Sequence, residues 1–413
     1  MRLETILNSV EKHAGFVYAD SARVGQSIEI TIRPRAHSRP QCVHCGQRGP
    51  THDRLERRRF EFVPLWGYRV FLVYRRRRVA CPQCGVHAEQ LPWAEGKQQL
   101  TTTYAWFLAR WAKRLSWSEV ARIFQTSWSS VYRAVTMAVA WGRARMVLDG
   151  VTVLGVDEVQ WQWGHKYLTV VYEVSAQSRR LLWIGREREA TTLRQFFEWF
   201  GTTRSHALRF ICSDMWQPYL KVIAEKAQQA VHVLDRFHVV AKLNKAIDEV
   251  RAQEAKALRS RGQEPVLSKT RWCLLKRPER LTEKQDHRLA ELLRYNLRTV
   301  RSYLLKEDFQ LLWNYRSPYW AGWFLDRWCT RAMRSRIEPM KKIARSMREH
   351  RPLILNWFRA RGEILGGAVE GLNNKLKLVT RRAYGFRSFR VIQIALYHTL
   401  GGSPEPEGTH RFC

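Results

Sequence analysis

The sequence lacks long apolar runs, and this absence limits the class of protein that it encodes. No stretch approaches the roughly 18 consecutive apolar residues that a transmembrane helix needs, which argues against a membrane-spanning protein. The opening residues, MRLETILNSV, do not have the pattern of a secretory signal peptide. We therefore expect a soluble protein of the cytoplasm with no membrane partner.

Acidic residues are scarce relative to basic ones. The 413 residues include 71 Lys and Arg but only 37 Asp and Glu, which gives a formal net charge of +34. A surface of this charge attracts polyanions and suits the phosphate backbone of nucleic acids. An anionic membrane is the main alternative partner, but no basic amphipathic helix stands out to support it. We expect nucleic acid as the partner, although a merely soluble basic surface is the simplest alternative.

The eight cysteines are few, but their distribution is informative. Four of them form two CxxC pairs, each followed by a glycine: Cys42, Cys45, Gly46 and Cys81, Cys84, Gly85. A glycine at this place lets backbone N–H groups turn toward the thiolates, and two thiolate pairs can complete a closed tetrahedral zinc site. Four free thiols or two disulfide-prone pairs are the alternative. The scattered cysteines are predicted to be thiols, mostly buried: Cys212, Cys273, Cys329 and Cys413.

The residues around the two CxxC pairs are rich in β-strand patterns. Residues 27–33, SIEITIR, alternate like a strand, and a longer β-rich stretch covers residues 57–81. A proline and a glycine interrupt this stretch and predict a hairpin near Leu65 to Gly67. Together these features predict a zinc ribbon of one or two hairpins.

From about residue 100 the pattern becomes helical. Ser116 and Glu119 resemble a capping box that opens a short helix through Phe124, and Ser127 caps a second helix after a tight turn. Two short helices joined in this way fit a helix-turn-helix, whose second helix enters the major groove of DNA. The side chains then free to face DNA are Ser129, Ser130 and Arg133. An ordinary helical hairpin without a ligand is the alternative.

An α/β pattern begins after Gly150. Three strand-like runs predict an antiparallel meander, and helices then alternate with two further strands up to residue 235. The resulting order βββαβαβ is the arrangement of ribonuclease-H-like folds, although the pattern by itself indicates only an α/β class. No strand pattern appears from residue 241 to about 360, which predicts an all-helical insertion.

The chain is long enough for two to three domains and apolar enough for separate cores. We predict a multidomain α+β and α/β protein made of a zinc ribbon, a helix-turn-helix and a ribonuclease-H-like core with an all-helical insertion. The boundaries that these patterns predict are a zinc-ribbon domain at 1–98, a helix-turn-helix domain at 99–149, the first part of the core at 150–240, the insertion at 241–360, helices that complete the core at 361–400, and a flexible tail at 401–413.

Three acids stand where the ends of strands and helices could meet. Asp157 lies in the first strand of the α/β pattern, Asp214 follows the fourth, and Glu370 opens the last major helix after Gly366 and Gly367. Residues at strand ends commonly gather in one crevice of an open α/β sheet. Three clustered carboxylates repel one another unless a divalent cation binds them, and Mg²⁺ bound by such a set supports phosphoryl transfer.

Three further residues are candidates for auxiliary roles beside these acids. Glu158 is adjacent to Asp157, and side chains alternate along a strand, so Glu158 is expected on the opposite face, paired with an arginine. Asp235 also follows a strand and competes with Asp214. His238 is either a core histidine or a group near the scissile phosphate.

Four motifs then give a resemblance to a known family. The motifs GVDE, CSDMW, LDRFH and VEGLNNKLKLVTRRAYGF follow the two CxxC pairs in this order. In this respect the chain resembles transposases of the ISL-three insertion-sequence family, from the first cysteine pair almost to the C-terminus. The C-terminal motif is long and therefore specific, whereas CxxC pairs occur in many families.

The resemblance implies a DDE transposase with a zinc-binding N-terminus, a helix-turn-helix and a ribonuclease-H-like catalytic domain. It implies that Asp157, Asp214 and Glu370 are the DDE acids, which bind Mg²⁺ or Mn²⁺ to nick the element's ends and join the 3′-OH to target DNA. The partner would be double-stranded DNA, both element ends and target. Cleavage at paired ends suggests a homodimer or higher homo-oligomer on DNA.

Polar residues of the C-terminal motif are the next candidates for DNA contact. Phosphate contact is expected for Asn374, Lys375, Lys377, Arg381 and Arg382. A solvated basic face is the alternative. Two functions also remain as rivals to a transposase. One is a DNA-binding regulator with an inactive α/β domain, and the other is a ribonuclease-H-like nuclease that cuts without joining.

Overall fold

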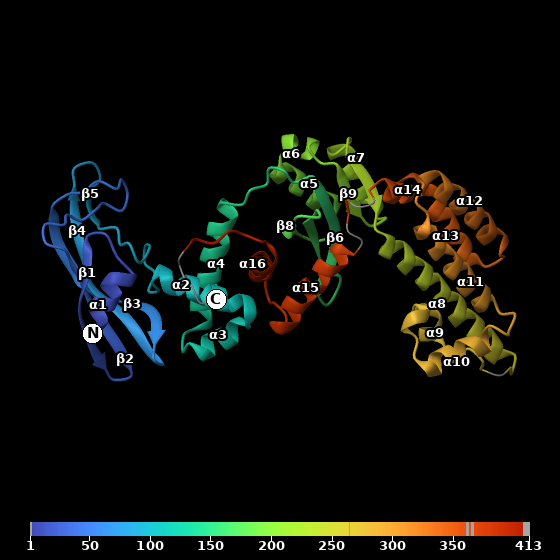
Figure 1. Cartoon of the computed structure of the whole chain (residues 1–413), viewed down its shortest axis with the longest axis horizontal. Helices are drawn as coiled ribbons and strands as arrows, with labels where there is room; N and C mark the ends of the chain where they lie inside the picture. The colour runs from blue at the N-terminus through green and yellow to red at the C-terminus, as the bar shows by residue number, and fades with distance from the viewer. Residues whose placement is uncertain (1, 264, 361–362, 365–366, 408–413) are drawn as a thin grey trace. The chain divides into compact units, whose positions relative to one another are not determined.

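The structure is a computed structural model that describes residues 2–263, 265–360, 363–364 and 367–407 (Figure 1). The chain divides into two compact units, Met1–Val147 with Leu378–Cys413 and Leu148–Lys377. Each unit combines helices with one five-stranded sheet that contains parallel and antiparallel pairs. The predicted mixed α/β character is therefore confirmed. Among the described residues, no helix is both long and apolar enough to cross a membrane.

The first unit begins with a helix and a twisted sheet. Its elements are α1 (Leu3–Val10), β1 (Phe16–Val24), β2 (Ser27–Pro34), β3 (Thr51–Leu65), β4 (Tyr68–Cys81) and β5 (Gly85–Ala88). The strand order is β1-β2-β4-β3, and β5 pairs with the end of β4. Trp93 fills the core beneath this sheet, where Phe16 and Tyr74 meet its ring edge-on at 4.9 and 5.5 Å.

The predicted hairpin near residue 65 is confirmed. Leu65 pairs with Tyr68, and the two residues between them, Trp66 and Gly67, have φ angles of 50° and 79°. Two successive positive φ angles give a turn whose twist matches that of the strands, and glycine adopts this conformation without strain. This turn sets the register of the long β3–β4 pair.

Four helices complete the first unit: α2 (Thr102–Arg114), α3 (Trp117–Ile123), α4 (Trp128–Ala144) and α16 (Phe389–Leu400). The predicted capping box is present, because the Ser116 side chain accepts the Glu119 N–H and the Glu119 side chain accepts the Ser116 N–H. Ser127 caps α4 as expected. Since α2, α4 and α16 pack together, the N-terminal helices and the last helix share one bundle.

The tail after α16 is held against this bundle as far as it is described. Glu405 forms ion pairs with Arg110 and Lys113 of α2. Ser403 lies so close to Gly142 of α4 that a β-carbon at Gly142 would stand 2.5 Å from the Ser403 β-carbon. Residues 408–413, the remainder of the predicted flexible tail, lie outside the described residues together with Cys413.

The second unit contains the predicted α/β pattern. Its strands are β6 (Val153–Gln162), β7 (Lys166–Val174), β8 (Arg179–Arg186), β9 (Phe210–Ser213) and β10 (Val231–Leu234), in the order β10-β9-β6-β7-β8. Strands β6, β7 and β8 form the expected antiparallel meander, whereas β9 and β10 add to the other edge of β6 in parallel. The intervening helices are α5 (Ala190–Phe200), α6 (Thr202–His206) and α7 (Gln217–Lys226).

Two glycines let helices approach this sheet closely. A β-carbon at Gly155 of β6 would lie 2.5 Å from Val369, in helix α15 (Ala368–Arg382). A β-carbon at Gly185 of β8 would lie 2.2 Å from Thr192 of α5. Such distances are too short for a real contact, so the absence of a side chain allows α15 to pack directly on the strand that carries Asp157.

The predicted helical tract is also present. The described residues from 236 to 359 contain helices and no strand. The α-helices are α8 (Arg236–Ser260), α9 (Arg271–Leu275), α10 (Glu283–Leu292), α11 (Arg298–Gln310), α12 (Pro318–Arg334), α13 (Glu338–Glu349) and α14 (Arg351–Arg359), with short 3₁₀ helices at Pro278–Arg280 and Leu311–Asn314. Their shared core includes Phe309 and Trp328, whose rings meet edge-on at 4.8 Å.

Candidate functional site

The four cysteines of the CxxC pairs come together at one end of the first sheet. The Sγ atoms of Cys42, Cys45, Cys81 and Cys84 all lie within 4.8 Å of one another. Gly46 and Gly85 have φ angles of 75° and 83°, the left-handed turns expected directly after each pair. Four thiolates at this spacing fit a structural zinc ion.

Backbone groups in this cluster favour the thiolate form. The N–H groups of Cys84 and Gln83 lower the pKa of the Cys81 thiol to about 7. The Cys84 thiol has its pKa raised to about 12, first by its hydrogen bond with Cys45. Opposite shifts are expected of adjacent thiols, because one thiolate opposes ionisation of the next, and a bound cation removes that conflict. The other cysteines that the structure describes, Cys212, Cys273 and Cys329, are buried free thiols, as predicted.

A second group of polar residues surrounds Asp157 in the second unit. The Asp157 carboxylate is buried and accepts the Glu158 N–H at 2.8 Å and Asn373 Nδ2 at 2.5 Å. Asn373 lies on α15 and accepts the Tyr172 hydroxyl of β7 at 2.8 Å through its own oxygen. His238 Nε2 lies 3.6 Å from Asp157 Oδ1. Asp157 is therefore held by groups from a strand and two helices.

Arg188 holds the second predicted acid. Its guanidinium lies 3.0 Å from Glu158 Oε1 and 3.0 Å from Asp214 Oδ2, so one cation bridges two carboxylates. It also lies over the Trp216 ring at 4.5 Å from the ring centre. The Trp216 N–H donates to Asp214 Oδ1 at 3.0 Å, which fixes this carboxylate at the start of α7. The expected pairing of Glu158 with an arginine is thus present.

Glu158 has a strongly perturbed acidity in this arrangement. Burial raises the pKa of its carboxyl to about 7, and the negative charges of Asp214 and Asp157 add to the rise against the effect of Arg188. Glu158 Oε2 and Arg188 Nε are both buried without a hydrogen-bond partner. Perturbed groups with unsatisfied polar atoms are typical of functional sites.

The remaining candidates lie near Asp157. Asp235 caps α8 by accepting the Phe237 N–H at 2.9 Å, and burial raises its pKa with further contributions from Asp157 and Glu370. The hydrogen bond to Asp157 raises the pKa of His238 to about 9. Glu370 is exposed in the first turn of α15. Asp235 therefore has a structural role as a cap as well as a place beside the other acids.

The acids differ from the cysteines in their spacing. Within the described ranges, the four cysteines are the only group of three or more His, Cys, Asp or Glu residues at metal-ligand spacing. Asp157, Asp214 and Glu370 are thus not gathered to that degree. Protein groups, Arg188 on Asp214 and Asn373 with His238 on Asp157, occupy the acids instead.

The predicted DNA-facing residues of the first unit lie at the start of α4. Ser129 and Arg133 are exposed and Ser130 is half-buried. The Ser127 hydroxyl lies 2.8 and 2.9 Å from those of Ser129 and Ser130, and Arg133 Nε donates to the Ser129 carbonyl at 3.2 Å. These side chains are preordered by local hydrogen bonds, with their polar atoms near the surface.

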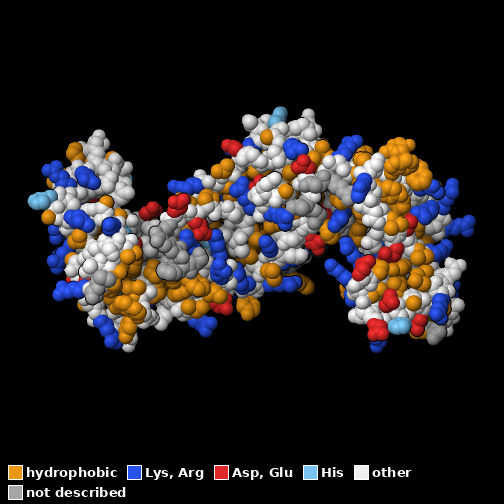
Figure 2. Space-filling model, in the orientation of Figure 1, with side chains coloured by type: hydrophobic (Ala, Val, Ile, Leu, Met, Phe, Trp, Pro, Cys, Tyr) orange, Lys and Arg blue, Asp and Glu red, His pale blue; other side chains and the backbone are white. Residues whose placement is uncertain are grey.

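The polar residues predicted on α15 divide into two groups. Four are exposed: Asn374, Lys375, Lys377 and Arg381. Arg382 is half-buried and donates to the carbonyls of Lys113 and Arg114 at 3.2 and 2.8 Å, where it satisfies groups at the C-terminal end of α2. Lys and Arg side chains are spread along every part of the chain on the face seen in Figure 2.

Comparisons with known proteins decide the family. The family model for ISL3 transposases of the DDE type, described as a transposase, matches residues 154–396. The chain belongs to this ISL3 transposase family. It is also 32% identical over 373 residues to the transposase for insertion sequence element IS1001 of Bordetella parapertussis, which covers 88% of this chain and 89% of that protein. Identity is 29% over 418 residues to the transposase for insertion sequence element IS1557 of Mycobacterium tuberculosis, with 95% and 93% covered.

Membership of the ISL3 family places the chain among enzymes that in general cleave and join DNA with a divalent metal ion. The matched range runs from β6 to α16 and therefore includes Asp157, Asp214 and Glu370. Carboxylate oxygens are the ligands that hard divalent cations prefer. The chemistry of the donor set in this ISL3 member thus fits the type of ion that its family uses.

Sequence reasoning missed several residues of the site in this ISL3 transposase. Asn373 and Tyr172 were not among the predicted residues, and neither was Arg188. Asn373 follows Glu370 by three positions, a spacing that puts both on one side of a helix and could have drawn attention to it. Arg188 stands in the charged run GRERE directly after β8, but the sequence contains many arginines, and only the fold selects this one.

Proposed function

We propose that this chain is a DDE transposase that binds the terminal inverted repeats of an insertion sequence and catalyses Mg²⁺-dependent cleavage and strand transfer. Asp157, Asp214 and Glu370 are the catalytic acids of this proposal, and Mn²⁺ is an alternative ion. Glu158, Asp235 and His238 are auxiliary groups. The family assignment supplies the class of reaction, and the residues follow from the arrangement of charges in the second unit.

The observation that carries the proposal is the electrostatic coupling of the acids. Asp157 and Glu370 both raise the pKa of Asp235, and Asp157 and Asp214 both raise that of Glu158. Acids brought from β6, β9–α7 and α15 therefore act on the same neighbourhood. Charged side chains are rarely buried unless they are paired, and here Asp157 and Asp214 are both buried.

The architecture supports the same proposal. A sheet in which a three-stranded meander is followed by two parallel strands fits a ribonuclease-H-like core, and the helical tract α8 to α14 fits an insertion into it. The pair α3–α4 fits a helix-turn-helix, and the four-cysteine cluster fits a zinc ribbon. We accordingly keep the predicted domain boundaries up to residue 360 as part of the proposal. Of the helices predicted to complete the core, α15 packs on β6, whereas α16 packs with α4 in the first unit, and the described part of the tail is held there by Glu405.

The chain's own residues would have the following roles. Asp157, Asp214 and Glu370 would hold Mg²⁺, which when bound supplies activation of the attacking oxygen and stabilisation of the leaving one. Asn373, fixed by Tyr172, orients the Asp157 carboxylate. His238 is protonated at neutral pH, because its pKa is about 9, and it stabilises the Asp157 charge.

The DNA contacts of the proposal lie on two elements. Ser129, Ser130 and Arg133 at the start of α4 would contact base edges or phosphates of the element ends. Asn374, Lys375, Lys377 and Arg381 of α15 would contact the phosphate backbone, and Arg382 would contribute charge while it caps α2. Since two ends are cut together, a homodimer or higher oligomer on DNA is expected.

The proposal is tested by an end-joining assay. The full-length protein is incubated with DNA that carries the ends of its element, a target plasmid and Mg²⁺. Wild-type protein should yield joined products, and Asp214→Asn should reduce them by several orders of magnitude. Its folding is checked by circular dichroism, because the change also weakens the buried pair with Arg188. Asp149→Asn is the control, because Asp149 is an exposed acid of the same unit paired with Arg204.

Three outcomes would contradict the proposal in different ways. Cleavage without joining would favour the nuclease. DNA binding with no chemistry in either protein would favour a regulator. Joining that survives Asp214→Asn would refute the assignment of this acid, and loss of joining in Asp149→Asn would show that the assay responds to general damage.

A further inference from the structure

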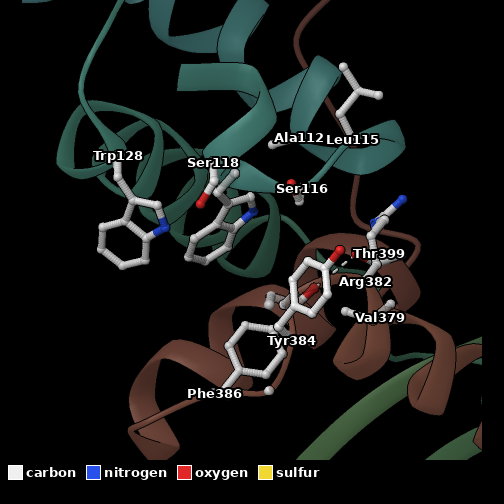
Figure 3. Close-up of a pocket in the computed structure, with 14 residues that line it drawn as sticks. Ala112, Leu115, Ser116, Ser118, Trp128, Val379, Arg382, Tyr384, Phe386 and Thr399 are labelled. Carbon is white, nitrogen blue, oxygen red and sulfur yellow. Dashed lines mark hydrogen bonds between the residues drawn. The ribbon is translucent and has the colours of Figure 1, made fainter. Parts of the chain in front are cut away.

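An open pocket of about 130 Å³ lies within the first unit, beside the helices predicted to read DNA. One side comes from the N-terminal ends of α3 and α4, and the other from the turn that joins α15 to α16 (Figure 3). Its aromatic lining residues are Trp117, Trp128, Tyr384 and Phe386. Trp128 reaches the pocket from α4, whereas Tyr384 and Phe386 reach it from the turn (Figure 3).

The aromatic rings of this pocket are unusually open to solvent. Tyr384 is fully exposed and Trp128 is 44% exposed. Trp128 is held in place by stacking on Tyr132, with ring centres 5.4 Å apart and planes 6° apart, and it lies 5.6 Å from Trp117. A rigid, uncovered aromatic surface on a folded protein marks a binding site more often than a random patch does.

The backbone at Tyr384 supports the same conclusion. Its φ angle is 53°, in the left-handed region that side chains other than Gly, Asn and Asp rarely adopt, and Gly385 follows with a φ of 89°. A conformation of this kind costs about 1 kcal/mol or more, and Tyr384 adopts it in the turn that ends α15, as do seven other described residues elsewhere that are not glycine. Here the strain presents an aromatic ring to solvent and brings no burial of that ring in return.

The charge of the side chains in and around the pocket indicates which class of ligand it favours. Among the residues that the structure describes, no carboxylate lines the pocket, whereas the Arg382 guanidinium does, fixed by its bonds to the end of α2. Arg381 and Arg387 are exposed on the same turn region. Glu119, which follows the lining residue Ser118, is already engaged in the capping box with Ser116. A ligand that joins a flat aromatic ring to a negative charge is therefore favoured over an uncharged apolar segment.

Among ligands that join an aromatic ring to a negative charge, the position of the pocket favours a base of DNA. In a helix-turn-helix the N-terminal residues of the second helix contact base edges while the first helix meets the backbone, and the pocket opens at both of these ends. The volume suits a single ring system, since a dry cavity of about 150 Å³ binds benzene. A base inside a duplex has no free face, so the occupant must have left the stack.

We propose that this pocket binds one unstacked nucleobase of the DNA substrate against the exposed rings of Trp128 and Tyr384, with the adjoining phosphate near Arg382. The proposal rests on the proposed function, because it requires that the protein bind DNA. It adds that DNA is distorted locally when it is bound, and that this distortion is stabilised outside the acidic site.

Two duplexes of one sequence test the proposal, one fully paired and one with a single unpaired 2-aminopurine, a fluorescent base. Wild-type protein should bind the second duplex about tenfold more tightly, as base–aromatic stacking predicts, and should quench its fluorescence. Tyr384→Gly removes the ring and suits the left-handed backbone, so it should abolish the preference and the quenching without unfolding. Trp128→Ala should act in the same direction.

Trp320→Ala is the matched control. Trp320 is 55% exposed on α12, close to the exposure of Trp128, but it lies outside the pocket. This variant should retain both the preference for the unpaired base and the wild-type affinity for the paired duplex. Folding is checked by circular dichroism.

The possible contrary results are distinguishable. Equal affinity of wild-type protein for both duplexes, or a preference retained in Tyr384→Gly, would overturn the base pocket and leave the proposed function intact. A shift of oligomeric state in Tyr384→Gly, measured by sedimentation without DNA, would assign the pocket to a second copy of the chain. Failure to bind either duplex would overturn the proposed function and this proposal together.

Discussion

The cysteine cluster and the acidic cluster are both groups of potential ligands of like charge, but they differ in spacing and in the groups that surround them. The four cysteines lie within 4.8 Å of one another on tight turns, with backbone N–H groups directed at their sulfur atoms. The acids lie on β6, between β9 and α7, and on α15. Asp157 and Asp214 each accept one backbone N–H, and side chains supply their other contacts: Arg188, Asn373 and His238. The four cysteine sulfur atoms are thus close enough together to bind one ion, whereas Asp157 and Asp214 are paired with other protein groups.

The difference follows from what each cluster is expected to do. A structural site stabilises the fold most when its ligands are already gathered, because binding then costs little rearrangement. A site for phosphoryl transfer must admit DNA and an ion together. Carboxylates neutralised by Arg188 and His238 can remain buried before substrate arrives, and the two unsatisfied atoms of the Glu158–Arg188 pair leave it free to rearrange.

The largest effect is expected at the cysteines. Cys81→Ser removes a ligand that ends β4, so the zinc ion should be lost and the first sheet should lose several kcal/mol, since structural zinc contributes about 10 kcal/mol in small zinc domains. Zinc content measured by atomic emission and thermal unfolding measured by circular dichroism check this prediction. Chelation of the wild-type protein should have the same effect.

A buried thiol of the other unit serves as the control. Cys273→Ser changes the same chemical group at a site in the helical core, where the thiol is free. It should leave the zinc content unchanged and cost no more than a local packing defect. Full zinc content in Cys81→Ser would show that the cluster is not the closed site that its spacing indicates.

An intermediate effect is expected at Arg188. Arg188→Gln leaves Glu158 and Asp214 without their shared cation, which should cost about 3 kcal/mol because both carboxylates are largely buried. The same change should let a divalent cation replace the lost charge. Mn²⁺ should therefore raise the melting temperature of the variant more than that of the wild-type protein.

Arg180→Gln is the control that distinguishes the Mn²⁺ response from the general effect of losing an ion pair. Arg180 pairs with Glu173 at 2.7 Å on the same sheet, and both side chains are well covered. The control should be destabilised without an added response to Mn²⁺. If both variants respond to Mn²⁺ equally, the acids near Arg188 are not the cation site, and the contrast with the cysteines would disappear.

Much of the fold follows from local signals in the sequence. The hairpin at Trp66 and Gly67, the capping box at Ser116 and the meander of β6 to β8 each depend on residues close together in the chain. Helix α1 and strand β1 were not predicted. Strand β1 forms a hairpin with β2 directly after it and α1 packs on β1, but core contacts such as Phe16 against Trp93 join residues far apart in the chain.

The acidic site was predictable only in part for the same reason. The motifs place Asp157, Asp214 and Glu370 on strand and helix ends, but no short-range pattern says which cation or amide will reach them. Arg188 and Asn373 act across 26 and 216 positions of the chain, respectively. The Asn373 contact depends on the packing of α15 on β6, which the missing side chain of Gly155 allows, whereas the Arg188 contacts depend on the end of β8 lying near β6 and β9.

The smallest expected effect is on the pH dependence of the unfolding free energy, which tests the charge of the acidic cluster. Burial beside other acids raises the pKa of Glu158 to about 7, above the unfolded value of 4.5. The folded state then binds more protons than the unfolded state between these values, so stability is present below pH 4.5 and is lost as the pH rises through 7. Relative to Glu158→Gln, the wild-type protein should lose about 2 kcal/mol of unfolding free energy between pH 5 and pH 8, measured by urea unfolding.

Glu225→Gln is the control and should not change the pH dependence of stability in this range, because a hydrogen bond from Lys226 lowers the pKa of that exposed acid. If the difference in unfolding free energy between the wild-type protein and Glu158→Gln does not change with pH, Arg188 fully neutralises Glu158. The acidic cluster would then be as stable without a bound cation as an ordinary ion pair.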